Sequence, residues 1–265
     1  MKTLVVSDMD GTLLNDQHDI SDVNLKAIHE LKEHQGFFTL ATGREERSVK
    51  TYLEKLDIQI PIIVCNGAKL YDPVTKQVIW ESTITLAQSV VNELITTCKK
   101  HDLGFLFYQE GQVYTPYMNE KVYNISLQDG VFPKVEKIEP LTNNPFTKIV
   151  LIGENSKLNQ LKSRLIDMDS ELNLVYSQDD VLELLPQGIS KGVAMNKLID
   201  ILGIEKTHTI AIGDNLNDLD MINNANVGVA VSNAHPTLIQ KADYVAGFNH
   251  QDAVAEVIKK FAITR

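Results

Sequence analysis

Short apolar runs alternate with periodic segments near the start of the chain, and the same rhythm returns after position 186. The runs have the length of buried strands, and the segments repeat an apolar residue every three or four positions, as one face of a helix does. Strands that alternate with amphipathic helices are typical of a parallel sheet, so we predict an α/β fold. The predicted strands are 4–6, 37–41, 62–65, 209–212, 227–231 and 244–246, and the predicted helices follow Ser21 and Arg44 or span 191–202, 235–241 and 252–260.

The middle of the chain, residues 83–186, has a different pattern. We predict helices at 86–100 and around a stripe of Leu158, Leu161, Leu165 and Met168, and no element in the polar stretch that ends at Pro145. The predicted strands are 105–108, 112–114, 146–152, 173–176 and 181–185. A predicted hairpin, 69–71 with 78–80, precedes this region. The pattern predicts an inserted α+β unit at 83–186, with residues 1–82 and 187–265 forming the sheet domain.

Composition narrows the function classes. The 265 residues are 43% hydrophobic and 23% charged, as in a soluble globular protein, and we expect a cytoplasmic protein without a membrane partner. A net charge of −10 without a basic cluster argues against nucleic acid as a partner. Cys65 and Cys98 have no metal-ligand spacing, so we expect buried free thiols.

Four polar clusters follow buried elements: residues 8–12, 42–44, 191 and 214–218. Three of them come directly after predicted parallel strands. In an open α/β sheet the ligand crevice lies at the carboxyl ends of the strands, so these distant clusters are expected to converge there.

The first cluster places Asp8 and Asp10 two residues apart, on the same side of an extended backbone. Two adjacent carboxylates repel unless a cation lies between them or one of them is protonated. Either arrangement suggests that the pair has a chemical function. An ordinary acidic turn is the alternative. A calcium loop would open in the same way, but its glutamate is missing here.

The clusters read Asp-x-Asp-Gly-Thr at 8–12, Thr-Gly-Arg at 42–44, Ser-Lys-Gly at 190–192 and Gly-Asp-x-x-Asn-Asp at 213–218. In this order they resemble the haloacid-dehalogenase (HAD) superfamily. The insertion and the Asn-Gly-Ala at 66–68 ahead of it resemble the Cof-type sugar-phosphate phosphatases. The resemblance implies a Rossmann-like core, with the insertion as a cap that closes over the crevice and selects the leaving group.

The resemblance assigns the nucleophile to Asp8, which forms an aspartyl phosphate, and the general acid and base to Asp10. A carboxylate is already ionised at neutral pH, so it needs no base to attack phosphorus. A dianionic phosphate beside these carboxylates requires a hard cation, and Mg²⁺ with oxygen ligands fits. Mg²⁺ is therefore the expected cofactor.

The resemblance also distributes the remaining positions. The expected Mg²⁺ ligands are Asp8, Asp214 and Asp10, the last through its backbone carbonyl. The expected phosphate contacts are Met9 through its N–H, Thr42 and Gly43 at an expected helix start, Lys191 and Asn217. Thr12 is expected behind the ligands, and Asp218 either on the ion or behind it. Arg44 and Arg47 are long enough to reach the ligand, but we expect both on a helix surface.

Two positions depart from the family pattern. Asn215 and Ser232 stand where the family often has glycine, and Ser232 begins a loop expected beside the site. Asparagine tolerates the left-handed backbone conformation that a glycine would adopt.

The expected activity is Mg²⁺-dependent hydrolysis of small phosphomonoesters, with sugar phosphates first by resemblance. The alternatives are a phosphohexomutase of the same fold, which would return the phosphoryl group to the sugar, and a metabolite-binding regulatory module. The intact Asp8 and Asp10 argue against the regulatory module. The sequence selects neither the substrate nor an oligomeric state.

Overall fold

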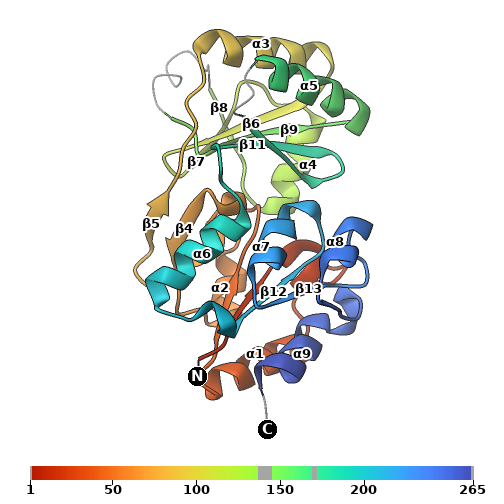
Figure 1. Cartoon of the computed structure of the whole chain (residues 1–265). Helices are drawn as coiled ribbons and strands as arrows, with labels where there is room; N and C mark the ends of the chain where they lie inside the picture. Colours follow the sequence, from red (N-terminus) through yellow and green to blue (C-terminus); the bar gives the residue numbers. More distant parts are fainter. Residues whose placement is uncertain (1, 137–144, 169–171, 264–265) are drawn as a thin grey trace. The chain divides into compact units, whose positions relative to one another are not determined.

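The computed structural model describes residues 2–136, 145–168 and 172–263, and of residues 167 and 168 only the backbone (Figure 1). Part of the polar stretch before Pro145, and the side chain of Met168 in the predicted stripe, lie outside this description. The chain forms two compact units. Unit 1 combines Met1–Trp80 with Ser190–Arg265, and unit 2 is Glu81–Ile189.

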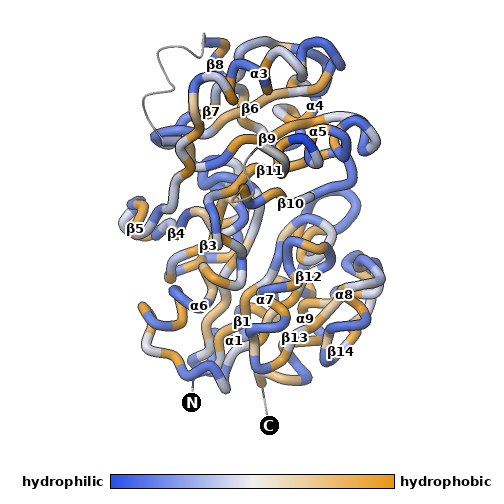
Figure 2. Tube along the Cα trace, turned by 45° about the horizontal axis from the view of Figure 1, so that its top comes forward, coloured by the Kyte–Doolittle hydropathy of each residue, from blue (hydrophilic) through white to orange (hydrophobic). Residues whose placement is uncertain are grey.

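Unit 1 contains a five-stranded sheet in the order β14-β13-β12-β1-β2, in which every pairing is parallel. Leu4 of β1 lies opposite Thr209 of β12 on one side and Phe37 of β2 on the other. The central strands consist largely of hydrophobic residues (Figure 2). The strands are β1 (Leu4–Ser7), β2 (Phe37–Leu40), β12 (Thr209–Gly213), β13 (Val227–Ala230) and β14 (Tyr244–Val245). The α/β class with a parallel-sheet core is confirmed.

Helices border this sheet, with α1 beside α9 and α6 beside α7 (Figure 1). The Ser21 hydroxyl caps α1 by accepting from the Asn24 N–H, as its position before the apolar stripe predicts. The helices are α1 (Asp22–Glu33), α2 (Lys50–Leu56), α6 (Lys191–Leu202), α7 (Leu219–Asn224), α8 (Pro236–Lys241) and α9 (Ala253–Val257). The sequence pattern did not predict α7, which is only six residues long.

One predicted strand pairs differently from the rest. β3 (Ile62–Val64) joins the hairpin of β4 (Lys69–Asp72) and β5 (Gln77–Glu81) in a separate three-stranded sheet, and its pairing with β4 is antiparallel. A single parallel bridge, Ala41 with Ile63, connects it to the end of β2. This bridge places the turn after β3 next to the loop after β2.

Unit 2 is an α+β unit built on a six-stranded sheet in the order β10-β11-β9-β6-β7-β8. Its strands are β6 (Gly104–Gln109), β7 (Gln112–Thr115), β8 (Lys134–Val135), β9 (Lys148–Ile152), β10 (Asn173–Gln178) and β11 (Val181–Leu185), and its helices are α3 (Gln88–Lys100), α4 (Glu120–Asp129) and α5 (Asn155–Met168). The prediction that no element lies between β7 and Pro145 is wrong, because α4 and β8 occupy part of it. The role of this unit as a lid stays a prediction.

Several aromatic residues of unit 2 lie in its own core. Phe105 and Phe107 are fully buried between α3, α5 and the sheet, and Tyr114 and Tyr117 pack against the same cluster. Cys65 and Cys98 are buried thiols, as expected. Within the part of the chain that the structure describes, no helix is both long enough and apolar enough to cross a membrane.

Candidate active site

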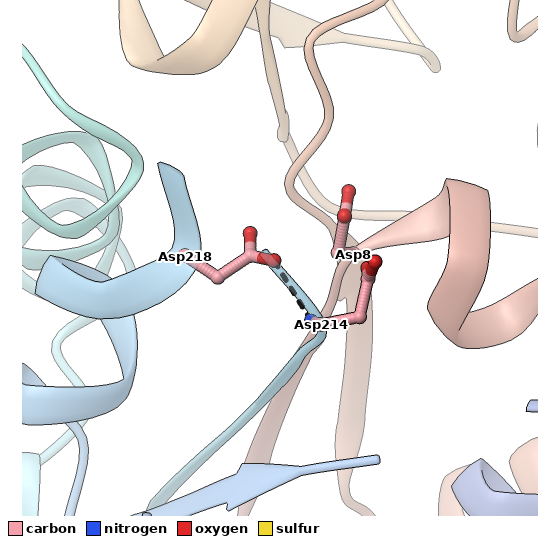
Figure 3. A group of neighbouring side chains, drawn as sticks. All are labelled: Asp8, Asp214 and Asp218. Carbon is pink, nitrogen blue, oxygen red and sulfur yellow. Dashed lines mark hydrogen bonds between the residues drawn. The ribbon is translucent and has the colours of Figure 1, made fainter. Parts of the chain in front are cut away.

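Two neighbouring strands, β1 and β12, place Asp8 and Asp214 side by side, because each aspartate directly follows its strand. The Asp8 N–H donates to the Ile212 carbonyl at 2.9 Å, which extends the parallel pairing to Asp8. One carboxylate oxygen from each of Asp8, Asp214 and Asp218 lies within 4.8 Å of the others (Figure 3). The predicted convergence of the first and fourth clusters is thus observed.

Asp218 holds the loop that carries Asp214. Its Oδ2 accepts a hydrogen bond from the backbone N–H of Asp214 at 3.0 Å (Figure 3). The same oxygen accepts from the backbone N–H of Asn215, also at 3.0 Å. Its Oδ1 accepts from the Lys191 ammonium at 2.6 Å. Both oxygens of Asp218 therefore have protein partners, which favours a place behind the ion rather than on it.

Lys191 is the first residue of α6, and its ammonium is completely buried. Its Nζ lies 2.8 Å from Asp8 Oδ1 and 2.6 Å from Asp218 Oδ1. The Ser190 hydroxyl caps the helix by accepting from the Val193 N–H at 3.0 Å and donates to Asp220. The third predicted cluster therefore meets the other two.

The buried charges do not balance, because one ammonium faces three carboxylates. Burial, followed by repulsion from Asp218, raises the pKa of Asp8 well above its usual value, although Lys191 opposes the shift. Burial and the same neighbour raise the pKa of Asp214 to about 7. Burial alone would lower the pKa of Lys191, but its contacts with Asp218 and Asp8 outweigh burial and raise it. The cluster therefore lacks positive charge.

A hard divalent cation fits this cluster. The available donors are carboxylate oxygens, which Mg²⁺ prefers, and a second positive charge would relieve the repulsion that raises the two pKa values. Asp8 and Asp214 are the residues that would hold the ion, together with the backbone carbonyl of Asp10 by family resemblance.

The turn after Asp8 is shaped for close approach to Asp214. Gly11 has a φ of +78°, and a Cβ built on it would lie 2.5 Å from Asp214 Oδ2. The Thr12 hydroxyl donates to Asp214 Oδ1 at 2.8 Å. Thr12 therefore stands behind Asp214, as predicted, and Gly11 leaves room for the carboxylate.

Replacing Gly11 with alanine is expected to lower Mg²⁺ affinity about tenfold, because the new Cβ must displace Asp214 from its place. Gly203 is a matched control, with a φ of +62° and open space around it. Both variants should lose about 1–2 kcal/mol of stability from the left-handed backbone. Calorimetric titration with Mg²⁺ should separate them, and equal affinities for Gly11→Ala and Gly203→Ala would disprove the displacement.

The Asp10 side chain is not one of the three carboxylates that lie together, Asp8, Asp214 and Asp218, and it contacts Arg44 instead. Arg44 holds its carboxylate with two hydrogen bonds, from Nε at 2.8 Å and from Nη2 at 2.7 Å. The Arg44 side chain is only 6% exposed, so its expected place on a helix surface is wrong. Arg47, whose side chain is 42% exposed and pairs with Glu45, does lie at the surface.

The expected helix start at Gly43 is also wrong, because α2 begins only at Lys50. The Arg44 side chain in the intervening segment turns inward to Asp10. The Thr42 hydroxyl is buried and accepts from the Arg44 N–H at 3.1 Å. Thr42 and Gly43 keep their predicted place after β2 but not the predicted helix behind it.

Asn217 lies in the short helical turn Leu216–Asp218, and its Nδ2 donates to Asn66 Oδ1 at 2.9 Å. Asn66 was not predicted as a site residue, although its position directly after the predicted strand 62–65 was a usable signal. Met9 is fully buried, and its carbonyl accepts from the Leu14 N–H.

The two departures from the family pattern have local explanations. Asn215 has a φ of −125°, so left-handed tolerance is not what it supplies; its Oδ1 accepts from the Leu216 N–H. The Ser232 hydroxyl donates to the Ala246 carbonyl, and the neighbouring Asn233 Nδ2 donates to the Gly11 carbonyl at 2.7 Å. The loop at Ser232 therefore borders the site, as expected.

Comparison with known proteins agrees with this arrangement. The family model for haloacid dehalogenase-like hydrolases matches residues 5–258. The 5-amino-6-(5-phospho-D-ribitylamino)uracil phosphatase YcsE of Bacillus subtilis is 29% identical over 98% of this chain and 96% of its own. The HMP-PP phosphatase of Cronobacter sakazakii is 25% identical over 97% and 95%. A haloacid dehalogenase-like hydrolase from Bacteroides thetaiotaomicron superposes with a TM-score of 0.85 at 28% identity, covering 98% of this chain and 99% of that one.

Proposed function

Because the chain belongs to the haloacid dehalogenase-like hydrolase family, we propose that it hydrolyses small phosphomonoesters with Mg²⁺, through a phosphorylated Asp8. The observation that carries this proposal is the meeting of Asp8, Lys191 and Asp214 at the carboxyl ends of adjacent strands. Named phosphatases among the relatives support the reaction class.

In the first half of the reaction, an Asp8 oxygen attacks phosphorus and the bond from phosphorus to the ester oxygen breaks. The leaving oxygen takes a proton, which we assign to Asp10, and departs as an alcohol. Lys191 contacts Asp8 Oδ1, so its charge lies beside the attacking carboxylate as the phosphoryl group arrives.

In the second half, water attacks the phosphorus of the acyl phosphate while Asp10 takes a proton from that water. The bond to Asp8 breaks, and inorganic phosphate and the free carboxylate are released. The two-point contact with Arg44 fixes the direction of the Asp10 carboxylate, which a residue that serves two steps requires.

Asp8 and Asp214, with the Asp10 carbonyl, would hold the Mg²⁺ ion. When bound, the ion supplies positive charge against the phosphoryl oxygens and the nucleophile. Lys191 and the amide of Asn217 are proposed to bind the remaining phosphoryl oxygens, together with Thr42, Gly43 and the N–H of Met9. Thr12 and Asp218 hold Asp214 in place.

The substrate class proposed is small phosphorylated metabolites, with sugar phosphates first. The test is a phosphate-release screen over sugar, flavin and pyridoxal phosphates. Free phosphate with an unchanged carbon skeleton supports hydrolysis, whereas an isomerised sugar phosphate identifies a mutase. The absence of any turnover across the panel would contradict the proposed function.

Chelation should remove the activity. Treatment with EDTA is expected to lower turnover at least about 100-fold, because the phosphoryl oxygens would then face carboxylates without the ion. Added Mg²⁺ should restore the rate, whereas Ca²⁺, which prefers more ligands and longer bonds, should restore less. A rate unchanged by EDTA after dialysis would overturn the proposed cofactor.

A further inference from the structure

Two neighbouring amides at the edge of the site leave buried hydrogen-bonding atoms without partners. Among the described residues, the buried side-chain atoms without a hydrogen-bond partner are Ser48 Oγ, Asn66 Nδ2 and Asn217 Oδ1. The last two belong to one contact, in which Asn217 Nδ2 donates to Asn66 Oδ1. A buried donor without an acceptor is costly, so an acceptor belonging to a bound molecule is expected near Asn66.

This conclusion does not depend on how the amides are oriented. Each amide nitrogen carries two hydrogens, and the contact between the two side chains uses one hydrogen in total. If both amides were reversed, Asn66 Nδ2 would donate one hydrogen to Asn217 Oδ1 and keep the other. In either orientation the Asn66 amide has an N–H to spare, and its residue is 1% exposed.

The backbone around Asn66 contacts the elements to which phosphate binding is assigned. The Asn66 N–H donates to the Thr42 carbonyl at 3.0 Å, and the Cys65 N–H donates to the Arg44 carbonyl at 2.9 Å. The next residue, Gly67, passes so close to α6 that a Cβ on it would lie 2.1 Å from the Ser190 carbonyl. Asn66 is therefore fixed against the loop after β2, the start of α6 and the turn at Asn217.

The turn that carries Asn66 is held in an unusual conformation. Cys65, Asn66 and Gly67 have φ values of +53°, +52° and +95° in succession. Cysteine rarely adopts this region, and the arrangement persists only where the surroundings impose it. The turn thus keeps the Asn66 amide in one place rather than letting it seek a partner.

We propose that Asn66 donates a hydrogen bond to a phosphoryl oxygen of the substrate, while its carbonyl oxygen orients Asn217 toward the same group. The proposal rests on the proposed phosphatase function. A phosphoryl oxygen is favoured as the acceptor because Asn66 is hydrogen-bonded to Thr42 and Asn217, two residues assigned to phosphate. The adjacent Gly67 lies against the start of α6, which carries a third. The negative charge of a phosphoryl oxygen also makes it a stronger acceptor than water or an alcohol.

Two substitutions test this contact without disturbing the turn. Asn66→Gly removes the amide and suits the positive φ, whereas Asn66→Asp keeps an acceptor for Asn217 but replaces the free donor with a negative oxygen. Inorganic phosphate is the probe, measured as a competitive inhibitor and by calorimetry in the presence of Mg²⁺. Asn24→Asp is the matched control, because Asn24 is a buried asparagine of α1 whose Oδ1 accepts from the Ala255 N–H.

We expect Asn66→Gly to weaken phosphate binding and to raise KM about tenfold, with a smaller change in kcat. Asn66→Asp should weaken phosphate binding about 100-fold, since its carboxylate would face the anion, and Asn24→Asp should stay within about twofold of the wild type. Weakening in both Asn66 variants supports the contact even if the screened esters are not substrates. Phosphate affinities equal to the wild type in a folded, active enzyme overturn it and leave the phosphatase function intact, and failure of the wild type to bind phosphate overturns both.

Discussion

Asp8→Asn is expected to reduce the hydrolysis of a simple aryl phosphate by at least about 10⁴-fold. An amide has nearly the shape of a carboxylate, but its neutral oxygen does not attack phosphorus. Phosphate release measures the effect. Rapid acid quenching and mass spectrometry of the wild type should find the phosphoryl group on the peptide that contains Asp8, and the variant should lack it.

The same variant should remain folded, which separates chemistry from stability. Removing one of three crowded carboxylates relieves repulsion, so without metal Asp8→Asn should melt no lower than the wild type. Asp200→Asn, on the exposed side of α6, is the control and should retain full activity. Turnover by Asp8→Asn within about tenfold of the wild type would exclude Asp8 as the nucleophile.

Lys191→Met is expected to lower the free energy of unfolding by about 3–5 kcal/mol without metal, because it leaves Asp8 and Asp218 buried without a cationic partner. Methionine fills most of the same space, so the loss is electrostatic rather than a cavity. Urea denaturation in EDTA measures it. Catalysis should fall as well, since the charge beside the nucleophile is lost.

Two comparisons sharpen this prediction. Lys197→Met changes an exposed lysine of the same helix and should cost less than about 1 kcal/mol. Adding Asp218→Asn to Lys191→Met should recover part of the lost stability, because one unpaired carboxylate disappears. A Lys191→Met variant as stable as Lys197→Met would show that the buried contacts do not hold the site together.

The convergence of Asp8 and Asp214 was predictable because it follows from chain direction. Apolar runs identify parallel strands, and the residues after such strands meet at one edge whatever their distance in sequence. The start of α6 was predictable from neighbouring residues alone, since Ser190 belongs to a residue type that is favoured at the N-cap of a helix.

Arg44 and Asn66 were not identified, because their roles depend on partners far away in sequence. Nothing near Arg44 indicates that it turns inward to Asp10, and the apolar residues that follow at helical spacing favoured a helix that starts too early. In the turn at Asn66, Cys65 has a positive φ that cysteine rarely adopts, so neighbouring elements impose this conformation and the local sequence does not predict it. In unit 2, α4 was not predicted, although the Asn119 side chain caps its first turn and Gly130 ends it in the left-handed conformation.

The chain leaves unit 1 after Trp80 and re-enters it at Ser190, one residue before the lysine of the site. The Lys197 ammonium lies 5.0 Å from the Trp80 ring, so the segments that flank the insertion are joined within unit 1. Every ionic group of the proposed chemistry belongs to this unit. The insertion can therefore be exchanged or remodelled while the groups of the proposed chemistry are inherited unchanged.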